Sequence, residues 1–394
     1  MSRRIGVGLI SAGWMGTLHS RAYLAAREKY PELGVTPDLV IVADTVEANA
    51  RRAADRLGFR DTADDYRAVL AHPDVDVVSI CSPNSLHREF ALAAIEARKP
   101  FWIEKPMGAG IADSRAIAEA TEASGLVTCV GFNYRHAPAI AHARDLIRSG
   151  ALGRITNVRC RFDADYSSSP DGPRTWRFVR AQAGSGVLGD LLSHGFDLAQ
   201  YLVGAINEVT ALTGTFIPER PQVAEGGIGH GVRSAADAPM LPVENEDWAG
   251  VLARFVNGAT GTFESSRVAV GPRCEYGIAV NGTQGSLEWD FERMNELRVC
   301  RLGVTYGYTR VLTDPAHGEF GRFQPGAGLG LSFDDLKTVE AALFLRSVIT
   351  GEQLAPSVAD GLAAASVADA AERSAEDGRW HAVPTAAGRT TFDR

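Results

Sequence analysis

The stretch "RIGVGLISAGWMG" (residues 4–16) determines how the first domain begins. Its apolar first half predicts a buried strand, and apolar residues at helical spacing follow over residues 16–28. Ser11, Gly13 and Gly16 have the spacing of a dinucleotide-binding turn whose first glycine is replaced by serine. Gly13 would let backbone N–H groups approach a pyrophosphate at the helix N-terminus, where the dipole favours an anion. This strand–turn–helix predicts a nucleotide site, and a glycine-rich turn without a ligand is the alternative.

The end of the next strand, residues 38–44, carries a carboxylate that suits a ribose. Asp44 stands where an acidic side chain accepts both ribose hydroxyls of an adenosine, and it would repel a 2′-phosphate. No arginine follows it directly, so the sequence favours NAD over NADP. The alternative role of Asp44 is to cap the following helix. Trp14 and Met15, in the first turn, complete the predicted contacts of this region.

Strand and helix patterns alternate through residues 1–131. Because strict alternation with short connections builds a parallel sheet with helices on both faces, we expect an α/β domain with a doubly wound Rossmann sheet. The predicted strands are 4–10, 38–44, 75–83, 100–106 and 126–133, and the predicted helices are 16–28, 47–58, 87–99 and 111–125.

The pattern changes in the second predicted domain, residues 132–394. A long alternating strand covers 153–166, a helix is predicted over 189–204, and a meander of strands separated by Gly and Asn turns follows. These features predict an α+β domain with a large, mostly antiparallel open sheet, with C-terminal helices that could pack back on the first domain. Because an open sheet usually pairs with another surface, we expect a homodimer or homotetramer formed through it.

The composition excludes several classes of partner. The 394 residues carry a formal net charge of −8, whereas nucleic-acid and anionic-membrane surfaces need a surplus of Lys and Arg. No apolar run approaches the ~20 residues that cross a bilayer. The five cysteines are scattered and form no CxxC pair, so neither a disulfide framework nor a cysteine zinc site is predicted. We therefore expect a cytoplasmic protein without a metal site.

Residues 99–110, "KPFWIEKPMGAG", place two charges at the end of an apolar strand. Because a proline interrupts a strand, the strand should end here and deliver Lys105 to the edge of the sheet. The alternative is a surface ion pair between Glu104 and Lys105. That pair would have poor geometry, because adjacent residues on a strand point to opposite faces.

The chain contains five motifs, in this order, that resemble those of the Gfo/Idh/MocA oxidoreductases: "GWMGTLH" (13–19), "CSPNSLH" (81–87), "EKP" (104–106), "GFNYR" (131–135) and "GDLLSH" (189–194). The likeness extends from Ile5 to about Trp380. Within that family, the segments most similar to levoglucosan dehydrogenase and related pyranoside 3-dehydrogenases are "GFNYR", "TWRF" (175–178), "IPERP" (217–221) and "PGAGLG" (325–330).

The resemblance implies a catalytic role for Lys105, whose ammonium would stabilise the alkoxide that develops as a hydride leaves. Glu104 would hold the strand end or tune the lysine, Pro106 would fix the turn, and residues 82–87 would pass beneath the nicotinamide ribose. The implied cofactor contacts are Ser11, Gly13, Trp14, Met15, Asp44, Ser82, Pro83, Asn84, His87, Glu104 and Lys105.

The resemblance also implies catalytic roles for Asp190 and His194. These residues are four apart, so a helix over 189–204 would place them on one face. An imidazole suits a general base, and Asp190 would bind the substrate or orient the histidine. An N-cap aspartate and a packed histidine are the alternative, and two ligands alone do not make a metal site. The implied substrate contacts are Lys105, Tyr134, Arg135, Asp165, Trp176, Arg177, Asp190 and His194.

These residues together predict an NAD-dependent dehydrogenase that oxidises a secondary hydroxyl of a sugar, anhydrosugar or cyclitol, at C3 of a glucose-like ring. Two alternatives remain open. One is an NAD-dependent glycoside hydrolase of the same fold that uses a transient 3-keto step. The other is a non-catalytic NAD-sensing protein, which would not need to keep both Lys105 and His194.

Overall fold

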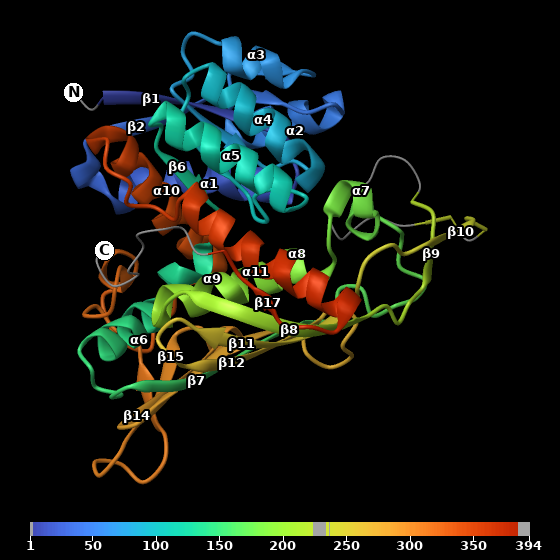
Figure 1. Cartoon of the computed structure of the whole chain (residues 1–394). Coiled ribbons are helices and arrows are strands. Elements are labelled where there is room, and N and C mark those ends of the chain that lie inside the picture. Colours follow the sequence, from blue (N-terminus) through green and yellow to red (C-terminus); the bar gives the residue numbers. More distant parts are fainter. Residues whose placement is uncertain (1–2, 224–233, 236, 385–394) are drawn as a thin grey trace. The chain divides into compact units, whose positions relative to one another are not determined.

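The computed structural model describes residues 3–223, 234–235 and 237–384, and the chain divides into two compact units (Figure 1). The first unit comprises Met1–Asn133 and Ser332–Leu362, and the second comprises Tyr134–Leu331 and Ala363–Arg394. The first unit is therefore built from two separate segments of the chain. Among the helices of the described ranges, none combines the length and the apolar character that a membrane span requires.

A six-stranded sheet in the order β3-β2-β1-β4-β5-β6 forms the centre of the first unit, and all its pairs are parallel. Its strands are β1 (Arg3–Ile10), β2 (Val35–Ala43), β3 (Asp61–Ala63), β4 (Val77–Ile80), β5 (Phe101–Ile103) and β6 (Thr128–Val130). The helices of this unit are α1 (Trp14–Lys29), α2 (Glu47–Leu57), α3 (Tyr66–Ala71), α4 (Asn84–Glu96), α5 (Ile111–Ser124) and α10 (Phe333–Thr350).

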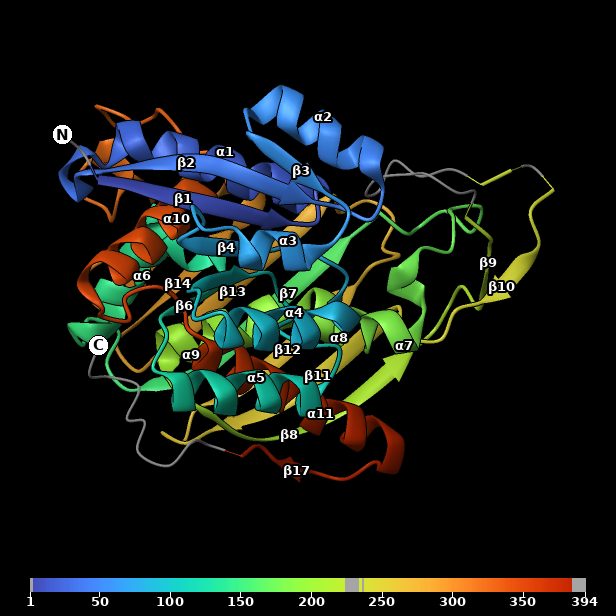
Figure 2. The same cartoon turned by 90° about the horizontal axis from the view of Figure 1, so that it is seen from above.

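The apolar runs of this sheet explain why it lies inside the unit. Every residue of β4, β5 and β6 is buried, as expected for a parallel sheet covered on both faces. Helix α1 packs with α2 and α10, and α4 packs with α3 and α5 (Figure 2). The predicted doubly wound parallel sheet is confirmed. The short elements β3 and α3 were not predicted, because segments of three and six residues carry too little periodicity.

A nine-stranded sheet in the order β16-β15-β14-β13-β7-β12-β11-β8-β17 dominates the second unit. Its pairs are antiparallel except β7 with β12, which is parallel, so the predicted large and mostly antiparallel sheet is confirmed. The strands are β7 (Ile155–Ala164), β8 (Ile206–Gly214), β11 (Trp248–Phe255), β12 (Thr260–Ser266), β13 (Cys274–Gly282), β14 (Gly285–Asp290), β15 (Glu296–Arg301), β16 (Thr309–Leu312) and β17 (His381–Ala382).

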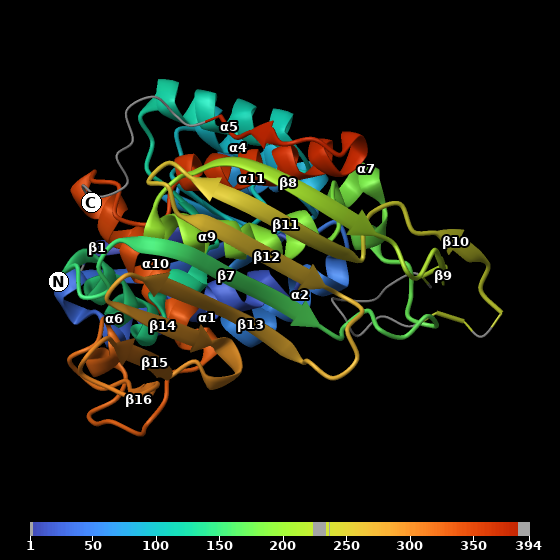
Figure 3. The same ribbon diagram turned by 60° about the horizontal axis from the view of Figure 1, so that its bottom comes forward.

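Helices cover one face of this sheet, and Figure 3 shows the other face as a broad surface of adjacent strands. The helices are α6 (Pro138–Arg148), α7 (Arg180–Ala183), α8 (Val187–Asp190), α9 (Leu192–Val203) and α11 (Val358–Asp377), which crosses from the first unit into the second. The alternating burial of β11 and β12 separates the inner apolar side chains from the outer ones.

One prediction for this unit needs correction. The helix predicted over 189–204 is divided at Leu191 into α8 and α9. Residues 219–246 contain a small separate two-stranded sheet, β9 (Glu219–Pro221) with β10 (Met240–Pro242), although residues 224–233 and 236 lie outside the described residues.

Candidate active site

The turn between β1 and α1 has the form that a phosphate loop requires. Ser11 has a φ of 78°, in the left-handed region that favours glycine, which explains why glycine is usual at this place. A Cβ on Gly16 would lie 2.2 Å from the Ser11 carbonyl oxygen, so only glycine allows the helix this close to the turn. Serine therefore occupies, at the first position of this turn, a backbone conformation that glycine adopts more easily.

The N-terminus of α1 is open to an anion. No side chain caps the helix at Gly13, and a Cβ built on Gly13 would meet nothing within 4 Å. The first-turn N–H groups of a 16-residue helix and free space over the backbone fit a pyrophosphate. Trp14 is 54% exposed and its ring stacks on Phe333 of α10 at 5.9 Å, while Met15 is half-buried.

Asp44 follows β2 directly and joins two turns of the first unit. Its Oδ2 accepts a hydrogen bond from the backbone N–H of Ala12 at 2.9 Å, and its Oδ1 accepts one from Val46 N–H at 2.9 Å. The carboxylate therefore holds the phosphate turn against the start of α2, which is close to the capping role considered as an alternative. The contact of Asp44 with a ribose stays a prediction.

The predicted nicotinamide segment lies at the start of α4, where Ser82 and Asn84 are buried and Pro83 precedes the helix. The two ring nitrogens of His87 lie 2.9 Å from the carbonyl oxygens of Ser82 and Pro106. His87 thus links this segment to the turn that follows β5. Both nitrogens are engaged by the backbone, so the structure favours a positioning role for this histidine over direct contact with the cofactor.

Lys105 lies in the turn immediately after β5. The strand ends at Ile103, Glu104 is buried, Lys105 is half-buried, and the Lys105–Pro106 peptide bond is cis. The strand therefore ends before the proline, at Ile103 rather than at the predicted residue 106, and it leaves the lysine just beyond the carboxyl end of a parallel strand. Ligands of open α/β sheets bind at this edge.

Glu104 is held by charged and polar groups of the first unit. Its Oε1 accepts hydrogen bonds from His19 Nε2 at 2.8 Å and from Lys337 Nζ at 2.6 Å, and its Oε2 lies 3.3 Å from the backbone nitrogen of Lys105. Burial alone would raise the pKa of Glu104, but the Lys337 ammonium and the His19 hydrogen bond outweigh it and hold that pKa well below its usual range.

The state of His19 follows from the same contacts. Burial lowers the pKa of His19 to about 4 despite its hydrogen bond to Glu104. The neutral ring donates from Nε2 to Glu104, and its Nδ1 lies 3.2 Å from the Ser79 hydroxyl, which can donate to it. These contacts give His19 a structural role, because both ring nitrogens face buried protein groups. Lys337 was missed, because it stands 233 residues from Glu104 and belongs to no motif.

In the second unit, Asp190 is the last residue of α8 and His194 lies in the first turn of α9. The helix break at Leu191 means that the two residues do not share one continuous helix face, so the argument from i,i+4 spacing was wrong. Their positions depend instead on separate contacts made by tyrosines of this unit.

Three tyrosines support these two residues. The Tyr166 hydroxyl donates to Asp190 Oδ2 at 2.9 Å, and the Tyr276 hydroxyl donates to the backbone carbonyl of His194 at 2.8 Å. The edge of Tyr134 packs against the imidazole at 4.7 Å between ring centres. Tyr166 follows Asp165, one of the implied substrate contacts, which was a usable signal, whereas nothing in the local sequence identifies Tyr276.

The remaining predicted substrate residues have different surroundings. Arg177 lies over the ring of Trp176 at 4.5 Å, and its Nε is 3.9 Å from Asp190 Oδ2, so the second unit brings these three together. Arg135 forms a two-bond ion pair with Asp197 in a buried setting, which favours a structural role. Asp165 pairs with Arg273 at the surface. The substrate contacts of Arg135 and Asp165 stay predictions.

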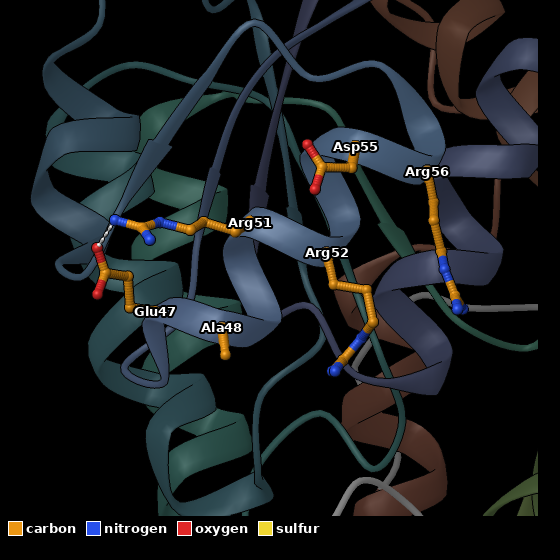
Figure 4. Close-up of a pocket in the computed structure, with 6 residues that line it drawn as sticks. All are labelled: Glu47, Ala48, Arg51, Arg52, Asp55 and Arg56. Atoms are coloured by element: carbon orange, nitrogen blue, oxygen red, sulfur yellow. Dashed lines mark hydrogen bonds and ion pairs between the residues drawn. The ribbon is translucent and has the colours of Figure 1, made fainter.

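A shallow cavity of about 400 Å³ lies over α2, away from these residues (Figure 4). Arg51 and Glu47 form an ion pair on its wall. One helix supplies its whole lining, which is Glu47, Ala48, Arg51, Arg52, Asp55 and Arg56. None of the predicted cofactor or substrate residues is among them. Within the described ranges, no group of three or more His, Cys, Asp and Glu side chains could hold a metal ion.

Comparison with known proteins places these features in one family. Residues 5–132 match the model of an oxidoreductase family with an NAD-binding Rossmann fold, and residues 140–288 match the GFO/IDH/MocA C-terminal domain. The chain is 37% identical to levoglucosan dehydrogenase of Pseudarthrobacter phenanthrenivorans over 97% of its own length and 99% of that protein. It is 26% identical to myo-inositol 2-dehydrogenase of Thermotoga maritima, over 95% of this chain and 97% of that protein.

Solved structures agree with the sequence matches. The structure of levoglucosan dehydrogenase in complex with NADH and levoglucosan is similar with a TM-score of 0.91 and 36% identity, over 97% of this chain and all of that chain. An inositol dehydrogenase homologue from Azotobacter vinelandii with NAD+ has a TM-score of 0.81 at 23% identity, over 97% of this chain and 98% of that one, and shows the shared fold. The chain therefore belongs to the Gfo/Idh/MocA family of oxidoreductases, whose N-terminal domain is an NAD-binding Rossmann fold.

Proposed function

We propose that this protein is an NAD-dependent dehydrogenase that oxidises a secondary hydroxyl of a pyranose or anhydrosugar, at C3 of the ring. One observation carries the proposal: the chain is 37% identical, over 97% of its length, to a levoglucosan dehydrogenase. A cyclitol is the neighbouring substrate class, because inositol dehydrogenases are related at lower identity.

The residues of the first unit fit NAD. The open backbone at Gly13 and the N-terminus of α1 would hold the pyrophosphate, and Asp44 would accept the ribose hydroxyls. Ser82 and Asn84, at the start of α4, would contact the nicotinamide side. When bound, NAD supplies a hydride acceptor.

Three side chains of this chain would carry the proton and charge chemistry. His194 takes the proton of the substrate hydroxyl as general base, and the ammonium of Lys105 stabilises the alkoxide that develops. Asp190 binds a neighbouring hydroxyl, with its carboxylate oriented by the Tyr166 hydroxyl at 2.9 Å. Tyr134 and Tyr276 restrict the position of His194, so the base does not have to be ordered during the reaction.

The experiment is a screen of pyranoses, anhydrosugars and inositols with NAD and with NADP, following reduced cofactor by absorbance. We expect levoglucosan or a related ring to give net NADH. Lys105→Ala and His194→Ala should each lower kcat by roughly 100- to 10,000-fold while NAD still binds. If the two residues act on the same hydroxyl, the double variant should be little worse than either single one.

Two results of this screen would reject the proposal. Normal turnover by Lys105→Ala would exclude the assigned mechanism. Cleavage of a glycoside without net NADH would identify the hydrolase alternative instead.

We also propose that the exposed face of the nine-stranded sheet joins copies of this chain. Leu212 and Leu252 lie on adjacent strands of that face and are 68% and 51% exposed. The ion pair of Arg254 with Glu208 flanks them, a composition that suits an interface. Light scattering should give a dimer or tetramer for the wild type and a smaller species for Leu252→Glu. Leu24→Glu, on α1 of the first unit, serves as the control, because this leucine is 44% exposed.

A further inference from the structure

Lys337 of α10 is among the most deeply buried charged side chains of the first unit, with 1% of its surface exposed. Its Nζ lies 2.6 Å from Glu104 Oε1 and 2.8 Å from Glu340 Oε2, and it stands over the Trp102 ring at 5.3 Å. One ammonium therefore serves two buried carboxylates. Lys337 belongs to none of the five sequence motifs.

The carboxylate of Glu104 has little room to move. A Cβ added to Gly131 would lie 2.6 Å from Glu104 Oε1, so the carboxylate packs directly on the backbone after β6. From another side, His19 donates to the same oxygen, and its ring stacks on Trp102 at 3.4 Å. Lys337 is the cation of this arrangement, so it determines whether Glu104 remains charged and in place.

We propose that Lys337 is a positioning residue for the catalytic lysine: it fixes Glu104, which in turn fixes the backbone of Lys105. The link is the 3.3 Å contact between Glu104 Oε2 and the backbone nitrogen of Lys105. The inference rests on the proposed function, in which Lys105 acts on the substrate.

The physical reason is that a buried carboxylate keeps its charge only while it is paired. Without the ammonium, burial would raise the pKa of Glu104. The protonated carboxyl would have no ion pair to hold it beside His19. The turn after β5 would then relax. A misplacement of ~1 Å at a reacting group can cost about 100-fold in rate.

The test measures kcat, KM for the sugar, and the Kd of NAD for Lys337→Met, Lys337→Arg and Arg346→Met. Lys337→Met should lower kcat by about 10- to 100-fold, with KM and the NAD Kd little changed. Lys337→Arg should recover part of the lost kcat, because it restores the cation. Arg346→Met is the matched control: it removes a cation from the same helix, one that pairs with Glu32 at 3.4 Å, and its kcat should equal that of the wild type.

A double-mutant cycle separates positioning from a general loss of stability. If Lys337 acts through Glu104, then Glu104→Gln and the double variant Glu104→Gln/Lys337→Met should have similar kcat values, well below wild type. Should Lys337→Met alone fail to fold, the double variant decides, because it removes both charges of the pair together. Wild-type kcat in Lys337→Met or in the double variant would overturn the proposal.

Lys105→Ala, measured beside these variants, distinguishes this inference from the proposed function. An inactive Lys105→Ala with a fully active Lys337→Met overturns the positioning role alone. An active Lys105→Ala overturns the proposed function, and the role of Lys337 with it.

Discussion

Each unit contains a glutamate with a strongly shifted pKa, Glu104 in the first and the half-buried Glu372 in the second, and the two glutamates differ in their neighbours. In the first unit, Glu104 faces the Lys337 ammonium, and its pKa is held well below the usual range. In the second unit, burial and then the negative charge of Glu246 raise the pKa of Glu372 to about 7. Burial raises the pKa of both carboxyl groups. The Lys337 ammonium reverses this at Glu104, whereas at Glu372 the Arg180 guanidinium, 3.5 Å away, does not offset burial and the charge of Glu246.

The surroundings of the two glutamates support different residues that are predicted to be catalytic. Glu104 directly precedes Lys105, whereas Glu246 Oε1 accepts a hydrogen bond at 3.0 Å from the backbone N–H of Leu188 in α8, the helix that ends at Asp190. The contact of Glu104 with the Lys105 backbone should therefore not depend on pH in the ordinary range. The hydrogen bond of Glu246 to α8 should be more sensitive, because Glu246 interacts with Glu372, whose pKa is raised to about 7.

Glu104→Ala is expected to have the largest effect on stability. This change leaves the buried Lys337 ammonium with Glu340 alone, so the free energy of unfolding should fall by about 3–5 kcal/mol. Urea unfolding at neutral pH measures the loss. No measurable decrease would contradict this prediction, because it would show that the ion pair contributes no net stability.

Glu372→Gln tests the raised pKa of Glu372 through the pH dependence of the free energy of unfolding. The folded protein keeps a proton on Glu372 up to a pKa of about 7, whereas the unfolded chain loses it near 4.5. Wild-type stability should therefore fall as pH rises through this window, by on the order of 1–2 kcal/mol. The variant should lack this decrease and gain relative stability at pH 8. Urea unfolding at several pH values measures it, and a constant difference between the two proteins would contradict the assignment.

Tyr276→Phe tests a hydrogen bond of the second unit that involves no charged group. The change removes the hydrogen bond to the His194 carbonyl and leaves that buried oxygen with one partner fewer, so stability should fall by about 1 kcal/mol. The loss should be independent of salt, unlike an effect of ion pairs. Unfolding in low and high salt measures it, and a strong salt dependence would argue against this explanation.

Ser11→Gly is expected to have the smallest effect. The φ of 78° strains a serine, but glycine also increases the entropy of the unfolded chain, so the net stabilisation should stay below about 1 kcal/mol. The melting temperature measures it, with the affinity for NAD as a second readout. A clear loss of stability would show that the serine hydroxyl has a role that the backbone argument omits.

Sequence patterns were most reliable where one segment contains the whole signal. The βαβ order, the turn at Ser11–Gly16 and the end of β5 before Pro106 each depend on neighbours a few residues apart. The helix predicted over 189–204 is interrupted at Leu191. The start of α8 depends on a distant segment, because Glu246 accepts a hydrogen bond from the backbone N–H of Leu188.

The same distinction applies to the candidate site. Lys105, Asp190 and His194 were identified from local motifs, and their roles remain predictions. Tyr276 was not identified, because it reaches His194 from 82 residues away.

The sequence by itself determined the alternation of strands and helices, the glycine positions of the phosphate turn and the residue types available for acid–base chemistry. These follow from periodicity and backbone sterics, which act over a few residues. Only the tertiary structure decided which charge Glu104 meets, which charge Glu372 meets, and which tyrosines hold Asp190 and His194. Electrostatic and hydrogen-bond energies depend on distance in space, and the sequence order does not contain that distance.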